Sequence, residues 1–237
     1  MRSAPAPRVA PWGTPRRWGV FVVGLCCLIT GIALAITADL GVGSWQVLET
    51  GLVEATGLPY GTVVLLEASA ALALAWLWLG ERPWIATVVL AFGGIGIGAL
   101  LDVLETPDSL VGRGALLAVG MALLAVGVAF YLASDLGASA QDALFVGFYR
   151  RYEVRPAVVR FGLDASAVAA GFALGGQLGV GTVVLTFAVP AMIEPALRLG
   201  HRLADTPLPA ALERPATASE VLAEEAVIAC GDDLPGR

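Results

Sequence analysis

Apolar residues fill long stretches of this chain and predict helices that cross a membrane. A helix needs about 20 mostly apolar residues to cross the hydrocarbon core of a bilayer. The pattern therefore predicts an all-α membrane protein with six transmembrane helices, several of them separated by short connectors rich in glycine, proline or charge. The six stretches are residues 18–38, 60–79, 85–104, 114–133, 157–174 and 181–199.

The composition supports a membrane environment. Hydrophobic residues make up 57% of the chain and charged residues only 14%, whereas an average soluble domain has about 25% charged residues. A soluble domain of this length could not bury so much apolar sequence. The net charge of −6 says little about the partners of the apolar part, because much of the acid lies after residue 203.

The placement of arginine predicts the orientation, since the chain contains no lysine. Cytoplasmic loops of membrane proteins carry an excess of positive charge. If the N-terminus lies inside, nearly every arginine before residue 203 falls on the inner side, and Arg113 falls outside. We therefore expect a multi-pass protein of a bacterial inner membrane, with both termini in the cytoplasm.

Three regions follow from these patterns. Residues 1–16 form a basic cytoplasmic segment, and residues 17–199 form the six-helix membrane domain. Residues 200–237 are rich in acid and proline, which predicts a mostly disordered cytoplasmic tail with at most one short helix at 219–229.

An internal repeat divides the membrane domain into residues 17–104 and 113–199. The triplet Asp-Leu-Gly at residues 39–41 recurs 96 positions later, in register with further matches such as Arg17 with Arg113. Because each half carries three spans, the second half enters the bilayer from the opposite face. The fold expected is thus two inverted three-helix repeats, as in many secondary transporters.

A turn motif follows the first span of each half. The glycine of the triplet breaks the helix, and Ser44 or Ser139 is expected to cap a short amphipathic helix. Such a helix either re-enters the protein, with its N-terminal amides free to meet an anion, or lies at the interface with Trp45 as an aromatic anchor. The residues of the motif are Asp39, Gly41, Ser44, Trp45, Asp135, Gly137 and Asp142.

Ionisable residues within the spans are candidates for a solute or ion pathway, because such groups are costly in a bilayer and usually functional. Arg160 and Asp164 lie four residues apart, so they share a helix face and can pair. For Asp102 and Arg160, snorkelling to the interface is the alternative. The candidates are Glu67, Asp102, Arg160, Asp164 and Glu194.

Signatures of enzymes are missing from the sequence. The single histidine, His201, lies outside the predicted spans, so a histidine-based metal site or a Ser-His-Asp triad is not possible in the membrane domain. The glycine-rich run at residues 93–98 lacks the lysine of a nucleotide-binding loop. We therefore expect no enzymatic activity, no metal, no cofactor and no nucleic-acid partner.

The turn motifs resemble the YczE/YyaS/YitT group of bacterial membrane proteins. The similarity rests on residues 31–48, 57–62 and 133–144, and it extends over all six spans. Gln46 departs from the pattern, since the group more often has an acidic residue after the tryptophan, whereas the second half keeps Asp142. The resemblance implies a polytopic inner-membrane protein, and it supports the architecture more than a mechanism.

These observations favour a secondary transporter or exporter of a small polar or amphipathic solute. In this hypothesis Glu67 and Asp164 bind a proton or cation, while Asp39 and Asp135 stabilise turns that gate the two faces. The alternative is a non-transporting membrane scaffold whose acidic tail docks a cytosolic protein. The expected partners are the lipid bilayer, the solute and, in a homo-oligomer, further copies of the chain.

Overall fold

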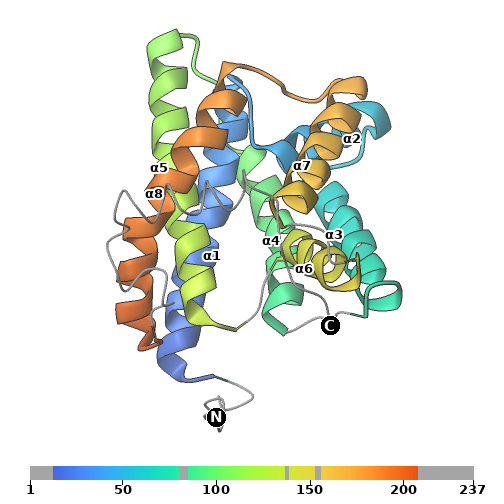
Figure 1. The fold of residues 1–237 in the computed structure, drawn as a ribbon. Helices are drawn as coiled ribbons and strands as arrows, with labels where there is room; N and C mark the ends of the chain where they lie inside the picture. Colours follow the sequence, from blue (N-terminus) through green and yellow to red (C-terminus); the bar gives the residue numbers. More distant parts are fainter. Residues whose placement is uncertain (1–12, 81–84, 137–138, 153–155, 208–237) are drawn as a thin grey trace, which may run out of the picture. The chain divides into compact units, whose positions relative to one another are not determined.

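The computed structural model describes residues 13–80, 85–136, 139–152 and 156–207. All regular structure in these residues is helical, which confirms the expected all-α class, and the helices belong to one compact unit that ends at Thr206 (Figure 1). The helices are α1 (Pro15–Ala38), α2 (Ser44–Thr56), α3 (Tyr60–Leu77), α4 (Ile85–Leu101), α5 (Leu110–Ser134), α6 (Ala140–Tyr152), α7 (Pro156–Ala173) and α8 (Val180–Ala204).

Each of the six apolar stretches forms a helix, but not every one has the length and hydropathy of a complete span. Within the described residues α1, α3 and α5 are long and apolar enough to cross a membrane. Helix α8 bends by 43° between Val180–Val189 and Ala191–Ala204, and these two pieces together would make a fourth span. The bend falls at Pro190, where proline removes a backbone hydrogen bond.

Helices α1 and α5 run in opposite directions in close contact (Figure 1). A methyl group added at Gly24 would lie 2.9 Å from the backbone nitrogen of Tyr131, and one added at Gly31 would lie 2.6 Å from that of Leu124. The beginning of α1 therefore packs on the end of α5, and the end of α1 packs on the beginning of α5. Small residues at such positions let membrane helices approach backbone to backbone.

The ends of α1 and α5 have the same local structure. Asp39 and Asp135 are the C-caps of these helices, and both have left-handed backbone conformations, with φ of 49° and 55°. After α1, Gly41 has φ of 112°, and a Cβ there would lie 2.7 Å from the backbone nitrogen of Gly179. Only glycine satisfies both conditions, as the sequence motif implied.

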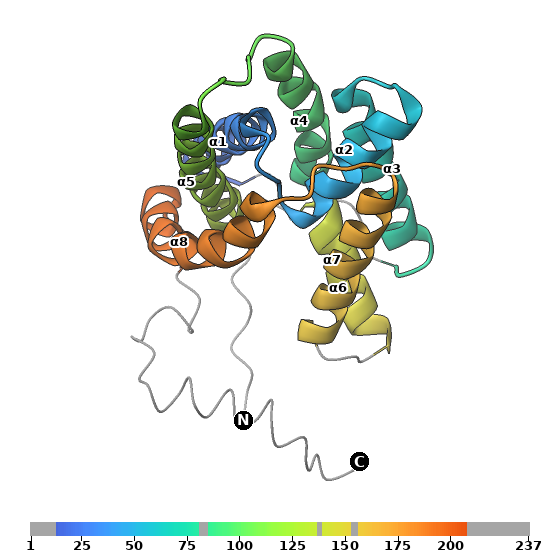
Figure 2. The same ribbon diagram turned by 90° about the horizontal axis from the view of Figure 1, so that it is seen from above.

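The remaining helices pack in a pattern that differs between the halves. Helix α4 packs on α3 and α1, with Gly61 against Gly94, whereas α8 packs on α5 and α1. Between the halves, α2 packs on α7 through Gly51 and Gly171, and α3 packs on α6. Seen from above, α1, α5 and α8 lie together, and α2, α3, α6 and α7 lie together on the far side of α4 (Figure 2).

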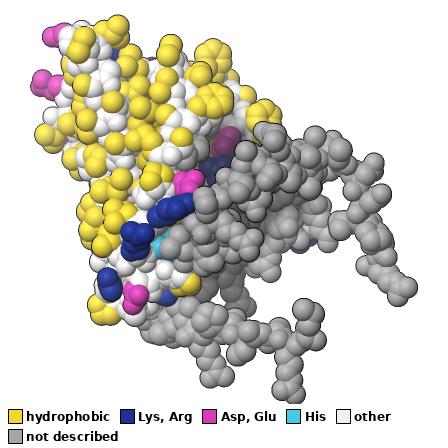
Figure 3. Space-filling view, turned by 60° about the vertical axis from the view of Figure 1, so that its left-hand side comes forward, with side chains coloured by type: hydrophobic (Ala, Val, Ile, Leu, Met, Phe, Trp, Pro, Cys, Tyr) yellow, Lys and Arg dark blue, Asp and Glu magenta, His cyan; other side chains and the backbone are white. Residues whose placement is uncertain are grey.

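The surface of the described helices is strongly apolar. On the face shown in Figure 3, hydrophobic side chains cover a broad area, and most of the visible arginine side chains gather toward its lower end. Phe187 on α8 is 76% exposed and Phe161 on α7 is 75% exposed. Apolar patches of this kind mark contact with a membrane or a partner.

The structure changes one predicted boundary. Helix α8 continues to Ala204, so the first residues of the predicted tail belong to the helical unit. His201 and Thr206 are buried there, and the Thr206 hydroxyl donates a hydrogen bond to the carbonyl oxygen of Ala133 at 2.8 Å. The predictions for residues 1–12, for the tail after residue 207 and for the short helix at 219–229 lie outside the described residues.

Candidate functional site

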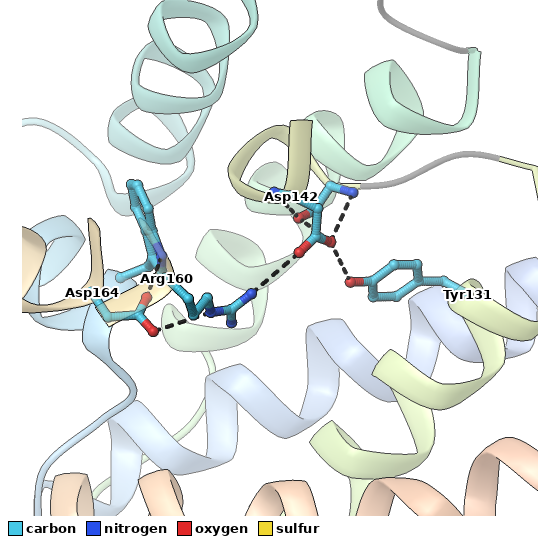
Figure 4. A network of polar contacts seen from close by, with 6 residues as sticks. Tyr131, Asp142, Arg160 and Asp164 are labelled. Atoms are coloured by element: carbon cyan, nitrogen blue, oxygen red, sulfur yellow. Dashed lines mark hydrogen bonds and ion pairs between the residues drawn. The ribbon is translucent and has the colours of Figure 1, made fainter. Parts of the chain in front are cut away.

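Arg160 lies between two carboxylates that come from different helices (Figure 4). Its Nε donates to Oδ2 of Asp164 at 3.1 Å, so the pair expected from the four-residue spacing is present. Its second ion pair joins a terminal guanidinium nitrogen to Oδ1 of Asp142, at 3.4 Å. A single guanidinium therefore connects α7 with the start of α6. We call Asp142, Arg160 and Asp164 the ionic triad.

The carboxylate of Asp142 is held by hydrogen bonds from two directions. The Tyr131 hydroxyl on α5 donates to its Oδ2 at 3.0 Å, and the Ser139 hydroxyl donates to the same oxygen at 2.7 Å. The backbone nitrogen of Asp142 donates to Oγ of Ser139 at 3.1 Å. Ser139 therefore caps α6, as the sequence predicted, and Asp142 closes a reciprocal capping arrangement.

Two hydrogen bonds link the halves, and their donors correspond in the repeat. The indole nitrogen of Trp45 on α2 donates to Oδ1 of Asp164 on α7 at 3.0 Å. The amide nitrogen of Gln141 on α6 donates to Oε2 of Glu67 on α3 at 3.3 Å. Trp45 and Gln141 are the second residues of α2 and α6 and lie 96 positions apart. Each short helix thus contacts an acidic residue on the long helix of the other half.

A second pair of acidic side chains, Glu49 and Glu67, lies on α2 and α3. Glu49 on α2 is only 4% exposed, and it accepts a hydrogen bond from the hydroxyl of Tyr60. Glu49 lies outside the apolar spans. Burial raises the pKa of its carboxyl to about 7, and the hydrogen bond from Tyr60 partly opposes this shift. The Oε1 atom of Glu67 is also buried, and no group in the described residues donates to it.

The two aspartates of the turn motif pair with the two arginines of the repeat. Arg113 on α5 contacts Oδ2 of Asp39 at 2.5 Å, donates to the carbonyl oxygen of Ala38 at 2.8 Å and also donates to the carbonyl oxygen of Asp39. Arg17 on α1 lies 3.7 Å from Oδ2 of Asp135. The carboxylate of Asp39, which the sequence analysis expected to stabilise a turn, is therefore part of a bond between the halves. A cation at a helix C-terminus also offsets the helix dipole.

Several predicted residues lie apart from the ionic triad. Asp102 is exposed just after α4, and Glu194 pairs with Arg198 at 2.8 Å on the exposed side of α8. Ser44 begins α2, but the cap position is Gly43, so the capping role predicted for Ser44 is wrong. Gly137 lies outside the described residues.

Some residues that take part in these polar contacts were not predicted from the sequence. Tyr131 lies in an apolar span with no periodic polar signal. Glu49 lies in the stretch for which the sequence left open both a helix that re-enters the protein and a helix at the interface, and no role was predicted for it. The pairing of Arg17 with Asp135 had a visible signal, because both residues recur at the repeat spacing.

A known protein family matches this chain over nearly the whole helical unit. The match covers residues 15–196, and the family is described as a family of unknown function, DUF6198. The chain belongs to DUF6198. A protein of Haemophilus influenzae, described as an uncharacterized protein, is 30% identical to this DUF6198 chain over 212 residues, which is 85% of this chain and 95% of the relative.

A second relative supports the resemblance to the YczE group. The uncharacterized membrane protein YczE of Bacillus subtilis is 24% identical over 188 residues, which is 75% of this DUF6198 chain and 87% of the relative. No solved structure matches the chain. The YczE-like relationship is confirmed, and together with the apolar helices it makes this DUF6198 chain a membrane protein.

Proposed function

We propose that this DUF6198 protein is a secondary transporter of a small polar or amphipathic solute in the bacterial inner membrane. The observation that carries the proposal is the ionic triad, in which Arg160 (side chain 55% exposed) joins the carboxylates of Asp142 and Asp164 (25% and 28% exposed) on helices of a mostly apolar unit. Ionisable groups in such surroundings are costly, and they commonly mark solute or ion pathways.

The proposal includes six spans arranged as two inverted repeats, with α1, α3, α4, α5, α7 and α8 crossing the bilayer. The helix boundaries support it, because α2 and α6 each have 13 residues, α3 and α7 each have 18, and both pairs begin 96 positions apart. The antiparallel packing of α1 on α5 is the relation that inversion requires. In this arrangement α2 and α6 do not cross, and their N-termini lie at the interface of the halves.

The packing difference between the halves supports a protein with two alternative states. Helix α4 packs on α3, whereas its counterpart α8 packs on α5, and α7 is not among the helices on which α8 packs extensively in the described part of the chain. In an inverted-repeat transporter, the halves exchange their arrangements as the site opens to one face and then to the other. Such an exchange needs an asymmetry between the halves, so the packing difference supports the proposal.

The acidic residues divide into two roles. Asp142 and Asp164 are both paired with Arg160, so we assign the ionic triad to solute binding and to the contact between α6 and α7. Glu67 receives one hydrogen bond, from Gln141, and its other carboxylate oxygen has no donor in the described residues. That oxygen can take up a proton or cation without breaking a protein hydrogen bond, so we assign Glu67 to ion coupling.

Solute-driven proton movement tests the proposal. Purified protein is reconstituted into liposomes that contain a pH-sensitive dye, and a panel of amines, amino acids and small organic acids is supplied outside under an imposed pH gradient. At least one solute should change the internal pH with wild-type protein, and Glu67→Gln and Arg160→Gln should abolish the change. Arg198→Gln removes an arginine from an exposed pair on α8 and should leave it intact. Equal fluxes in wild type, Glu67→Gln and Arg160→Gln would favour the scaffold alternative.

A further inference from the structure

A hollow lies where the end of α3 meets the end of α6, separate from the ionic triad. It is lined by Ala73, Leu74, Leu77 and Trp78 from α3 and by Arg151 from α6. Residues 73, 74, 77 and 78 follow the spacing of one helix face, so the hollow has an apolar wall that runs along α3. Arg151 is the charged residue of its lining.

The apolar wall has the features of a surface that contacts lipid near the membrane boundary. Leu77 is 79% exposed, and Trp78, the C-cap of α3, is 58% exposed. Tryptophan is enriched at the level of the lipid headgroups, where its ring lies in the apolar region and its N–H remains near water. In the proposed arrangement of spans, the end of α3 then lies at one bilayer interface, with the earlier turns of the helix in the acyl region.

Arg151 supplies a positive charge at the same level. It is exposed, its guanidinium carbon lies 6.0 Å from the ring centroid of Tyr152, and it forms no ion pair with a carboxylate of the described residues. By contrast, Arg160 and Arg198 are each committed to an acidic side chain. Arg151 can therefore bind an external anion without breaking an ion pair within the described residues.

We propose that this hollow binds an anionic phospholipid, with the headgroup phosphate on Arg151 and one acyl chain along the α3 wall. An apolar wall beside a guanidinium matches the two chemical parts of such a lipid. A zwitterionic lipid adds a cationic group next to the phosphate and so gains less from Arg151. With the orientation assigned to the repeats, the lipid belongs to the cytoplasmic leaflet, whose surface is anionic.

Native mass spectrometry of the full-length protein in detergent tests this site. Phosphatidylglycerol and phosphatidylcholine with identical acyl chains serve as competing probes. Wild-type protein should retain phosphatidylglycerol with a preference of about fivefold, as expected for one arginine beside an anionic lipid. Arg151→Gln should lose the preference, and Arg151→Lys should keep most of it. Arg202→Gln, which removes an exposed arginine at the end of α8, is the matched control and should behave as wild type.

A second variant separates the site from general electrostatics. Ala73→Phe fills the apolar end of the hollow and leaves the charge in place, so it should lower the retention of both lipids. It also decides the question if Arg151→Gln does not yield monodisperse protein. The proposal is overturned if Arg151→Gln binds phosphatidylglycerol as wild type does, if Arg202→Gln loses the same preference, or if Ala73→Phe retains both lipids unchanged.

Discussion

The indole nitrogen of Trp45 donates a hydrogen bond to Asp164 at 3.0 Å, across a separation of 119 residues. The bond joins the first short helix of one half to the ionic triad on the other half. Its counterpart in the repeat is the bond from Gln141 to Glu67. These two bonds connect the interface between the halves directly to the acidic residues that we assign to transport.

Trp45→Phe should destabilise the protein by about 1.5–3 kcal/mol, the range for a hydrogen bond to a charged group, while keeping most of the packing of the ring. Trp76, which is 54% exposed on α3, provides a matched control, and Trp76→Phe should change stability little. Thermal unfolding of both variants in the same detergent measures the difference. Equal melting temperatures for the two variants would show that the bond to Asp164 contributes little.

The two ion pairs of the turn motif should differ in strength. Arg113 contacts the carboxylate of Asp39 and also two carbonyl oxygens at the end of α1, whereas Arg17 lies 3.7 Å from Asp135. Arg113→Gln should therefore destabilise the protein more than Arg17→Gln, because it leaves helix-end carbonyls without donors. The partly exposed ion pairs themselves should contribute at most about 1 kcal/mol.

At Asp39, substitution with asparagine should cost less than substitution with alanine. Asparagine tolerates the left-handed conformation with φ of 49°, whereas alanine does not adopt it readily. Chemical denaturation of the arginine and aspartate variants gives the comparison. An order in which Arg17→Gln is the more damaging arginine change would contradict the geometry.

The contact between α1 and α5 makes a further prediction. Gly31→Ala places a methyl group 2.6 Å from the backbone of Leu124, so the two helices must separate, at a cost of about 1–3 kcal/mol. Gly162 lies on α7 with no atom within 4 Å of an added Cβ, so Gly162→Ala should be neutral or slightly stabilising. Melting temperatures in detergent compare the pair. If Gly31→Ala is as stable as wild type, the close approach of α1 and α5 is wrong.

Stability should fall as pH rises toward neutrality because of Glu49. A carboxyl whose pKa is about 7 in the folded protein, against an ordinary value of 4.5, favours folding when it is protonated. Its contribution is complete below the ordinary pKa and is lost as pH rises through about 7. Glu49→Gln should therefore unfold at a higher temperature than wild type at pH 8 and show a weaker dependence on pH. A lower melting temperature for Glu49→Gln at pH 8 would contradict the assignment.

The sequence predicted the positions of the long helices because apolar length is a local property. It also predicted the contact of Arg160 with Asp164, since residues four apart on a helix are neighbours. It did not predict that Trp45 reaches Asp164 or that Tyr131 reaches Asp142, because these contacts depend on how the halves pack. The prediction that Ser44 caps α2 is wrong, because Gly43, one residue earlier, takes the cap position.

The proposed exchange of arrangements between the two halves is tested most directly by spin-label distance measurements in lipid nanodiscs. One variant carries labels at Ser69 on α3 and Phe92 on α4, and the other carries them at the repeat equivalents Ala165 on α7 and Phe187 on α8, all four exposed. A change of pH, or a solute active in the liposome assay, should move the two distance distributions in opposite directions, with α3 leaving α4 as α7 approaches α8. Distributions that stay fixed for both pairs under every condition would contradict transport by exchange of the halves.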